Sequence, residues 1–312
     1  MFATSLRQVS GPVTYVGANI YYWGEEEARR LLLHGLAPWA RDVCDRGLAR
    51  HFWWTRFDAR GPHLFTVFST SPDKETELQR FLNHAIDEFL RQSPSTVELP
   101  AEILEQRHLG CRGAMMCLGD KPDGLAQNNS FSLFSHANEN YPMSLGRDMA
   151  DSTDFWQHLD QLAFWAIQQA QSEIGPAVVQ WFAAVDQALQ HHGISPENYW
   201  CFHLSTLFVY PTQKNWRDRR DDFKSWLPRA LSDHNRNLFS HLWMPQDRNQ
   251  TLDVDVEGLV GATLADDGRT LDRRFMVLRQ INHQLLLQIG LFAKFEIPLV
   301  LYAWYKALSA KP

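Results

Sequence analysis

Two closely spaced β-rich segments constrain the fold more than any other feature of the sequence. His51–Phe57 (HFWWTRF) and Leu64–Ser69 (LFTVFS) are dominated by aromatic and β-branched residues, which favour strands. Between them lies Asp58–His63 (DARGPH), whose Gly-Pro pair is typical of a turn. The three segments together predict an antiparallel β-hairpin.

The sequence on either side of the hairpin predicts what pairs with it and what covers it. Val13–Trp23 has the composition of a further strand, and Glu25–Arg46 has the spacing of an amphipathic helix that Pro38 kinks or splits. After the hairpin, Ser71 is expected to cap a helix whose first residue is Pro72. The order strand, helix, hairpin, helix predicts a mostly antiparallel sheet covered by helices.

The rest of the chain divides into an irregular part and a helical part. Ser93–Asn140 contains scattered Gly, Pro, Asn and Ser and is predicted to be irregular. The segments with helical periodicity that follow are Ser152–Gln171, Pro176–His192, a helix starting at Ser195–Glu197, Trp216–Leu231, Leu271–Ile289 and Phe292–Ala310. We find no linker or repeat, so the prediction is one α+β domain over residues 1–312, with a sheet-rich part (1–92) and a mainly helical part (151–312).

Composition and motifs exclude several functions. The 312 residues carry a net charge of −6, which argues against a nucleic-acid-binding surface. The apolar run Ile297–Tyr305 is too short to cross a bilayer, and the N-terminus has no signal peptide pattern, so we expect a soluble, cytoplasmic protein with no membrane partner. GxGxxG, GxxxxGK[ST], HExxH and CxxC motifs are absent, so neither a cofactor nor a metal is expected.

The hairpin resembles the signature of the lantibiotic dehydratase C-terminal (elimination) domain family. The matching residues are Phe52, Trp53, Trp54, Arg56, Phe57, Asp58, Gly61, Pro62, His63 and Leu64. Near the C-terminus, Asn282-His283 through Gly290 to Glu296 lies where that family carries a histidine-rich helix. The resemblance is close in the N-terminal part, weaker beyond it, and implies a free-standing member of the family.

The sequence departs from the eliminating members of the family at two positions. In those members two arginines follow the His-Leu pair and hold a glutamyl ester, whereas here the corresponding residues are Phe65 and Val67. Alternation along a strand places His63, Phe65 and Val67 on one face, which we expect to bind substrate. An apolar wall is unsuited to glutamate and suits flat, neutral substrate. The alternative is that Phe65 and Val67 fill the core.

The departure resembles another branch of the family, the thiopeptide pyridine synthases. That resemblance implies a formal aza-[4+2] cycloaddition of two dehydroalanines in a ribosomally made precursor peptide, with loss of water and of the leader peptide. The partner would be this precursor, with its leader and its dehydrated, azole-containing core, and no cofactor is implied. The candidate catalytic residues are His283, Asn282, Arg56 and Tyr210, and the candidate substrate-binding residues are His63, Phe65, Val67 and Trp54.

Structural roles remain open for three of these residues. His283 is also compatible with an ordinary helix histidine, Arg56 with an anchor for the turn through Asp58, and Trp54 with core packing rather than stacking on thiazole rings. Two rival functions are a split glutamate-eliminating lyase and a non-catalytic module that binds the leader peptide. A homodimer also remains open.

Overall fold

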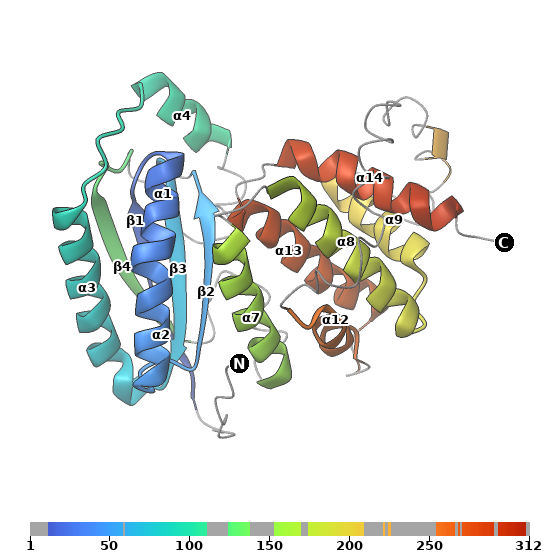
Figure 1. The fold of residues 1–312 in the computed structure, drawn as a ribbon, viewed down its shortest axis with the longest axis horizontal. Helices are drawn as coiled ribbons and strands as arrows, with labels where there is room; N and C mark the ends of the chain where they lie inside the picture. The colour runs from blue at the N-terminus through green and yellow to red at the C-terminus, as the bar shows by residue number, and fades with distance from the viewer. Residues whose placement is uncertain are drawn as a thin grey trace. The chain divides into compact units, whose positions relative to one another are not determined.

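The protein is represented by a computed structural model that describes residues 12–58, 60–110, 124–137, 153–169, 174–208, 221, 224, 225, 254–265, 268, 270–289 and 293–309. The chain divides into two compact units, Met1–Ile167 and Gln168–Pro312. The first contains a sheet with helices packed on it, and the second is helical (Figure 1). The α+β class that the sequence predicts is confirmed, and a single domain over residues 1–312 stays a prediction.

A four-stranded antiparallel sheet forms the centre of the first unit. Its strands are β1 (Thr14–Tyr21), β2 (His51–Phe57), β3 (His63–Thr70) and β4 (Ser130–Ala137). They pair in the order β2-β3-β1-β4. β2 and β3 are the predicted hairpin, whose turn is closed by a 3.1 Å hydrogen bond from the Gly61 N–H to the Asp58 carbonyl. Gly61 has a φ of 122°, which explains why a residue without a side chain stands there.

Strand β4 lies inside the stretch that the sequence predicts to be irregular, so that prediction was wrong over Ser130–Ala137. Helix α4 (Ala101–Gly110) lies in the same stretch and was also missed. β4 pairs with β1 from Thr14↔Ala137 to Tyr21↔Ser130, which places β1 in the interior of the sheet.

The first helical segment follows the sequence pattern and shows how Pro38 is accommodated. α1 (Glu25–Leu31) continues through a π-helical turn, Leu32–Leu36, into α2 (Ala37–Asp45). A proline donates no hydrogen bond and crowds the carbonyl one turn earlier in a regular α-helix. The widened turn directly before Pro38 relieves both problems, so the predicted kink takes the form of a local π-bulge.

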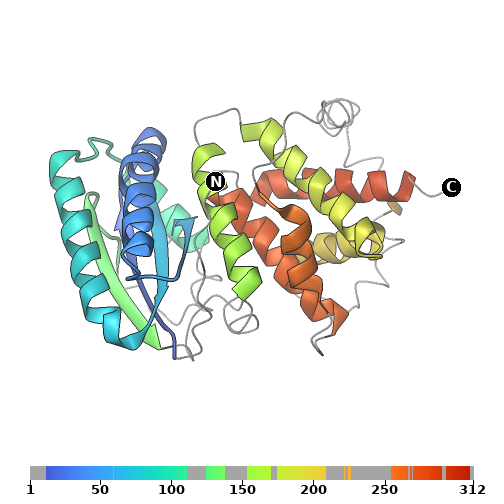
Figure 2. The same cartoon turned by 60° about the horizontal axis from the view of Figure 1, so that its bottom comes forward.

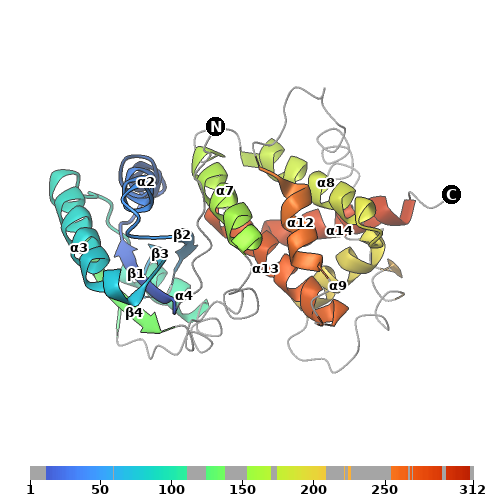
Figure 3. The same ribbon diagram turned by 90° about the horizontal axis from the view of Figure 1, so that it is seen from below.

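Helix α3 (Glu75–Gln92) packs on the same face of the sheet as α2 (Figures 2 and 3). Its buried side chains recur at helical spacing and are Leu78, Leu82, Ile86 and Leu90. A short 3₁₀ turn, Pro72–Lys74, precedes it. Ser71 does stand at the N-cap of this turn, but its side chain makes no capping hydrogen bond, so the predicted capping interaction was wrong.

Helix α7 (Thr153–Gln169) packs against β2 within the first unit. Asp160 on α7 accepts a 2.9 Å hydrogen bond from the Phe52 backbone N–H through Oδ1. Its Oδ2 lies 2.6 Å from Nδ1 of His51. The sequence grouped this helix with residues 151–312, whereas these contacts attach it to the sheet.

The second unit is built from helices around a dense aromatic and aliphatic core. Their bounds are α8 (Ile174–His191), α9 (Pro196–Phe208), α12 (Val256–Leu264), α13 (Leu271–Gln288) and α14 (Ala293–Ser309). Side chains cap three of them: Ser195 accepts from the Asn198 N–H at 3.4 Å, Asp255 from the Gly258 N–H at 2.8 Å and Thr270 from the Arg273 N–H at 3.3 Å. Among the described residues, no helix is long and apolar enough to cross a membrane.

Most predicted C-terminal helices agree with the structure to within a few residues. α8, α13 and α14 start and end close to their predicted bounds, α9 starts where a helix start was predicted, and α14 continues through Pro298. The predicted helix Trp216–Leu231 lies largely outside the described residues. α12 was not predicted.

We predict that Gly17→Ala destabilises the protein by about 3 kcal/mol, because the new methyl group enters a filled space. A Cβ at Gly17 would overlap the backbone oxygen of Thr66 and the ring of Phe134. Urea unfolding followed by tryptophan fluorescence measures the free energy of unfolding.

Gly47→Ala is the matched control. Gly47 has a φ of 66°, and the nearest atom to a methyl group at this position is Lys74 Nζ, at 3.8 Å. The stability lost in Gly47→Ala therefore comes only from the backbone conformation and amounts to about 1 kcal/mol. Equal losses for the two variants would show that the space over Gly17 is not filled.

Candidate functional site

Two histidines share one buried carboxylate in the second unit. His283 Nδ1 on α13 lies 2.7 Å from Glu296 Oε2 on α14, and His203 Nε2 on α9 lies 2.8 Å from Glu296 Oε1. The side chains of Glu296 and His203 are 0% exposed, whereas that of His283 is 25% exposed. Of the three groups, His283 is therefore the one that a ligand can reach. We call these three residues the His-Glu-His cluster.

Glu296 and His203 are held in defined charge states within the cluster. Burial alone would raise the pKa of Glu296, but hydrogen bonds from both imidazoles, reinforced by their charge, hold its pKa well below the usual range. Glu296 also lies in the first turn of α14, where the helix dipole favours an anion. Burial lowers the pKa of His203 despite the adjacent carboxylate, and the charges of Arg279 and His283 act in the same direction. At neutral pH the carboxylate is therefore ionised and His203 is neutral.

Asn282, the neighbour of His283, is enclosed in a second hydrogen-bonded group. Its Oδ1 accepts from Trp181 Nε1 at 2.7 Å, and its Nδ2 donates to the hydroxyl of Tyr199 at 2.7 Å. Asn282, Trp181 and Tyr199 are all 0% exposed. Burial raises the pKa of Tyr199 well above its ordinary value, so the phenol stays protonated. Both polar ends of the Asn282 amide are used inside the protein, which assigns this residue to packing α13 against α8 and α9.

The helical repeat explains why the cluster forms where it does. Tyr199 and His203 are four residues apart on α9 and so lie on one face of that helix. Asn282 and His283 are consecutive, so they point about 100° apart, the first inward and the second toward the margin of the helix. Sequence analysis missed Trp181, Tyr199 and His203. The available signal was the pair Tyr199 and His203, at helical spacing and next to the aromatic residues Trp200 and Phe202.

The sheet places three of the predicted substrate-binding residues on one face. By register, Phe65 is opposite Asn19 and Thr55, Val67 is opposite Gly17 and Trp53, and His63 pairs with Phe57. This gives His63, Phe65 and Val67 a common side of the sheet, as strand alternation predicts.

The exposure of these residues differs. Phe65 is half-buried and stacks on Phe134 of β4, with ring centroids 5.1 Å apart and planes at 10°. The Phe134 ring reaches this position across Gly17, where a side chain would block it. Val67 is only 5% exposed. Of Phe65 and Val67, Phe65 is thus the accessible one.

His63 is buried beside the turn of the hairpin. It packs against Tyr21, with ring centroids 4.7 Å apart, and its Nδ1 donates to the Gly61 carbonyl at 2.9 Å. Burial lowers the pKa of His63 to about 4, and the charge of Arg60 adds to this, although the Gly61 hydrogen bond opposes it. His63 is therefore neutral at physiological pH, and its donor nitrogen is already used by the turn.

Two other predicted site residues lie on the opposite face of the sheet. Trp54 pairs with Thr66, is 0% exposed, and donates its Nε1 hydrogen to the Ala163 carbonyl of α7 at 3.2 Å. Arg56 contacts both carboxylate oxygens of Glu25, each at 2.7 Å, at the start of α1. Neither side chain shares a face with Phe65. Tyr210 lies outside the described residues.

Within the described ranges, no group of three His, Cys, Asp or Glu side chains has an arrangement that could hold a metal ion. In the His-Glu-His cluster both imidazoles point a nitrogen at a carboxylate oxygen rather than toward a common point. The cluster is therefore a hydrogen-bonded arrangement centred on Glu296.

We predict that His63→Asn flattens the pH dependence of stability between about pH 4 and 6.5. Because the pKa of His63 is lowered to about 4 in the folded state, the unfolded chain binds more protons below pH 6.5. The stability due to this histidine is complete above pH 6.5 and is lost as the pH falls toward 4, by up to about 3 kcal/mol. Melting temperatures of both proteins across this range measure the effect. Both proteins retain His203, the other histidine whose pKa is lowered by burial. An identical slope for the two proteins would therefore contradict the lowered pKa of His63.

Comparisons with known proteins match the fold and not the sequence. No protein family model matches the chain, and no curated protein matches its sequence. Among solved structures, the pyridine synthase TbtD from thiomuracin biosynthesis superposes with a TM-score of 0.63 and 14% identity, over 96% of this chain and 98% of that chain. The tRNA-dependent lantibiotic dehydratase MibB from Microbispora sp. 107891 superposes with a TM-score of 0.52 and 13% identity.

The extent of these matches differs in one respect. The match with MibB covers 98% of this chain and 28% of that chain, so the protein corresponds to a part of the dehydratase. The fold implied by the hairpin resemblance is confirmed by both structures. The chain has the lantibiotic dehydratase-like fold that TbtD shows over nearly its whole length.

Proposed function

We propose that this protein is a pyridine synthase of thiopeptide-type peptide biosynthesis. It would join two dehydroalanines of a modified, ribosomally made precursor in a formal aza-[4+2] cycloaddition, and release water and the leader peptide. The observation that carries the proposal is the half-exposed Phe65, which replaces a carboxylate-binding arginine on the accessible part of the sheet face. The shared fold with TbtD over both chains supports it.

The sheet face favours this reaction over glutamate elimination. An eliminating enzyme has to bind a glutamyl carboxylate, for which guanidinium groups are the effective partners. On this face Phe57, Phe65, Val67 and Phe134 lie among the small polar residues Asn19, Thr55 and Ser132, with the neutral His63 at one end. Stacked aromatic rings suit the flat, uncharged azoles and alkenes of a thiopeptide precursor.

Most of the rate acceleration in this proposal comes from holding the substrate. Bringing two alkenes of one flexible peptide into contact has an entropic cost, and oriented binding supplies up to roughly 7–11 kcal/mol of the barrier reduction. One amide must also reach its iminol form. His283 takes the proton from the amide nitrogen at Nε2 and returns it to the carbonyl oxygen, which leaves the imidazole unchanged at the end of the step. Positioned proton transfer of this kind contributes roughly 10²–10⁴-fold.

The implied partner is the precursor peptide, and no metal or organic cofactor enters the proposed steps. The leader peptide would supply most of the affinity, because the core is transformed and has to be released. A homodimer and a cytoplasmic location remain expectations. Two other functions compete: glutamate elimination, in line with the fold of MibB, and leader binding without catalysis.

We predict that the purified protein converts a precursor with azoles and two dehydroalanines into a macrocycle and a free leader fragment, with no metal or nucleotide added. Mass spectrometry detects both products. His283→Ala is expected to lower the single-turnover rate at least 10²-fold with little change in leader affinity, because proton transfer matters in the transition state.

Two results would contradict this. Conversion of a glutamylated precursor to dehydroalanine would identify a lyase, and leader binding without turnover of any precursor would identify a binding module. A His283→Ala protein that cyclises at the wild-type rate would remove His283 from the mechanism.

We further predict that Phe65→Arg slows cyclisation at least tenfold while the melting temperature changes by only a few degrees. Phe65 is half-buried, so a longer arginine side chain can reach water, yet it brings a charge to a face that binds neutral substrate. Phe65→Leu is the control, since it stays apolar and is expected to keep most of the activity. Val67→Arg is less informative because Val67 is 5% exposed, and a buried charge there disturbs folding. An unchanged rate for Phe65→Arg would place Phe65 outside the substrate site.

A further inference from the structure

The His-Glu-His cluster contains two groups that the proposed reaction does not use directly. Glu296 and His203 are fully buried and lie on different helices; Glu296 contacts the accessible His283 directly, and His203 is linked to it through Glu296. Burying a charged group has a large energetic cost unless strong hydrogen bonds or an opposite charge replace the lost water. Glu296 has one imidazole on each oxygen, at 2.7 and 2.8 Å.

The protonation of each ring follows from what a carboxylate can do. An ionised carboxylate only accepts hydrogen bonds, so the nitrogen facing it must carry a hydrogen. His283 therefore has its hydrogen on Nδ1, which leaves the lone pair on Nε2 of this partly exposed ring. His203 has its hydrogen on Nε2, and its buried Nδ1 has no hydrogen-bond partner among the described residues. A second hydrogen on His203 would be a buried donor without an acceptor, which keeps this ring neutral.

We propose that Glu296 is a positioning residue that fixes His283 in the Nδ1-protonated form with Nε2 free, and that His203 holds the second carboxylate oxygen in place. The catalytic part of this inference rests on the proposed function. The consequence is that His283 alone changes protonation during the reaction: it gains a proton at Nε2 and gives it up again. The carboxylate offsets the positive charge on the ring while that proton is bound.

The charged and titratable groups around the cluster come from all three helices that form it. α9 contributes His203 and the protonated Tyr199, α13 contributes His283 and Arg279, and α14 contributes Glu296. Arg279 lowers the pKa values of both His203 and Tyr199, so its positive charge lies close to the cluster. Glu296 is the anion that opposes this charge next to His283. Its removal should therefore change the tautomer of His283.

The first experiment needs no substrate. Nitrogen-15 NMR of labelled protein reports which nitrogen of each histidine carries hydrogen, and the signals are assigned with His203→Leu and His283→Ala. The expected result is Nδ1–H for His283 and Nε2–H for His203. In Glu296→Gln, His283 should move toward the Nε2–H form, because the amide no longer requires a donor at Nδ1. If His283 keeps the same tautomer in Glu296→Gln, or shows Nε2–H in the wild type, the positioning role is overturned.

The second experiment measures rates. Glu296→Gln should lower the single-turnover cyclisation rate about 10- to 100-fold with unchanged leader affinity, and Glu296→Asp should recover part of the loss. His203→Gln retains an N–H near the position of Nε2 and should stay within about threefold of wild type, whereas His203→Leu should resemble Glu296→Gln. An unchanged rate for Glu296→Gln would overturn the catalytic part. If the wild type does not cyclise any precursor, the proposed function fails, and the NMR result still decides whether Glu296 positions His283.

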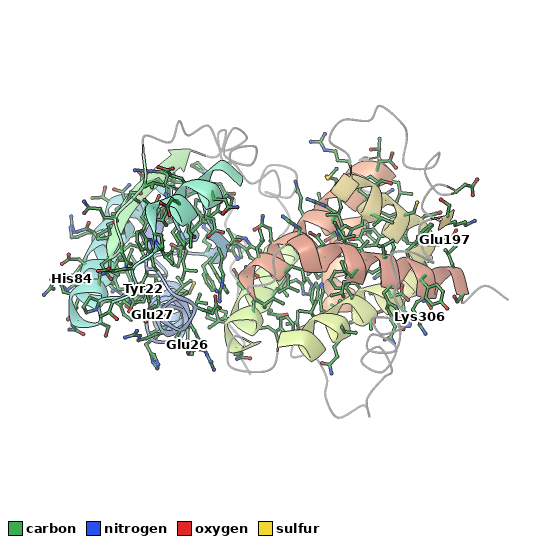
Figure 4. The ribbon with its side chains drawn as sticks, turned by 90° about the horizontal axis from the view of Figure 1, so that it is seen from above. Tyr22, Glu26, Glu27, His84, Glu197 and Lys306 are labelled. Atoms are coloured by element: carbon green, nitrogen blue, oxygen red, sulfur yellow. The ribbon has the colours of Figure 1, made fainter. Side chains whose placement is uncertain are left out.

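Asp186→Asn is the matched control for removing a buried carboxylate. Asp186 on α8 accepts from Trp200 Nε1 at 2.8 Å, an interaction that the amide oxygen can also make. Its carboxylate feels the charge of Lys306, which is labelled in Figure 4 toward the end of α14. Lys306 is ten residues beyond Glu296, or about 15 Å along the helix. Asp186→Asn should leave both the cyclisation rate and the two histidine tautomers unchanged, and a loss equal to that of Glu296→Gln would point to general destabilisation.

Discussion

A carboxylate without water around it must be neutralised or fully hydrogen-bonded, and Glu296 satisfies this requirement with two imidazoles. Because His203 comes from α9, His283 from α13 and Glu296 from α14, the need to hold one anion fixes three helices against each other. Next to them, the amide of Asn282 serves Trp181 on α8 and Tyr199 on α9. The interior of the second unit thus combines apolar packing with a polar arrangement that tolerates few alternatives.

The sheet is determined differently, by the alternation of side chains along its strands and by the space left over Gly17. One face is covered by α2 and α3 (Figure 3), and the other carries Phe57, Phe65 and Phe134. The stack of Phe65 on Phe134 spans β1 and requires Gly17 beneath it. The surface of this face is therefore set as much by the residue without a side chain as by the two aromatic rings.

The sequence was sufficient for features that depend on local patterns. The hairpin followed from two β-rich runs and a Gly-Pro turn, and the disturbance at Pro38 from the chemistry of proline. The common face of His63, Phe65 and Val67 followed from alternation alone. β4 was missed because Phe131 and Leu133 alternate with serines, and small polar residues are also typical of loops. The partners of His283 could not be derived, since Glu296 and His203 lie on separate helices and only tertiary packing brings them together.

The contact between Asp160 and β2 has a consequence for association. The outer edge of a sheet normally presents unpaired backbone N–H groups, which allow a further strand to add, either from a bound peptide or in aggregation. Here the Phe52 N–H is already bonded to a side chain of α7, and the same carboxylate holds His51. A peptide therefore cannot extend the sheet beside Phe52 without first displacing a helix. At this edge the sheet is protected against the addition of a further strand.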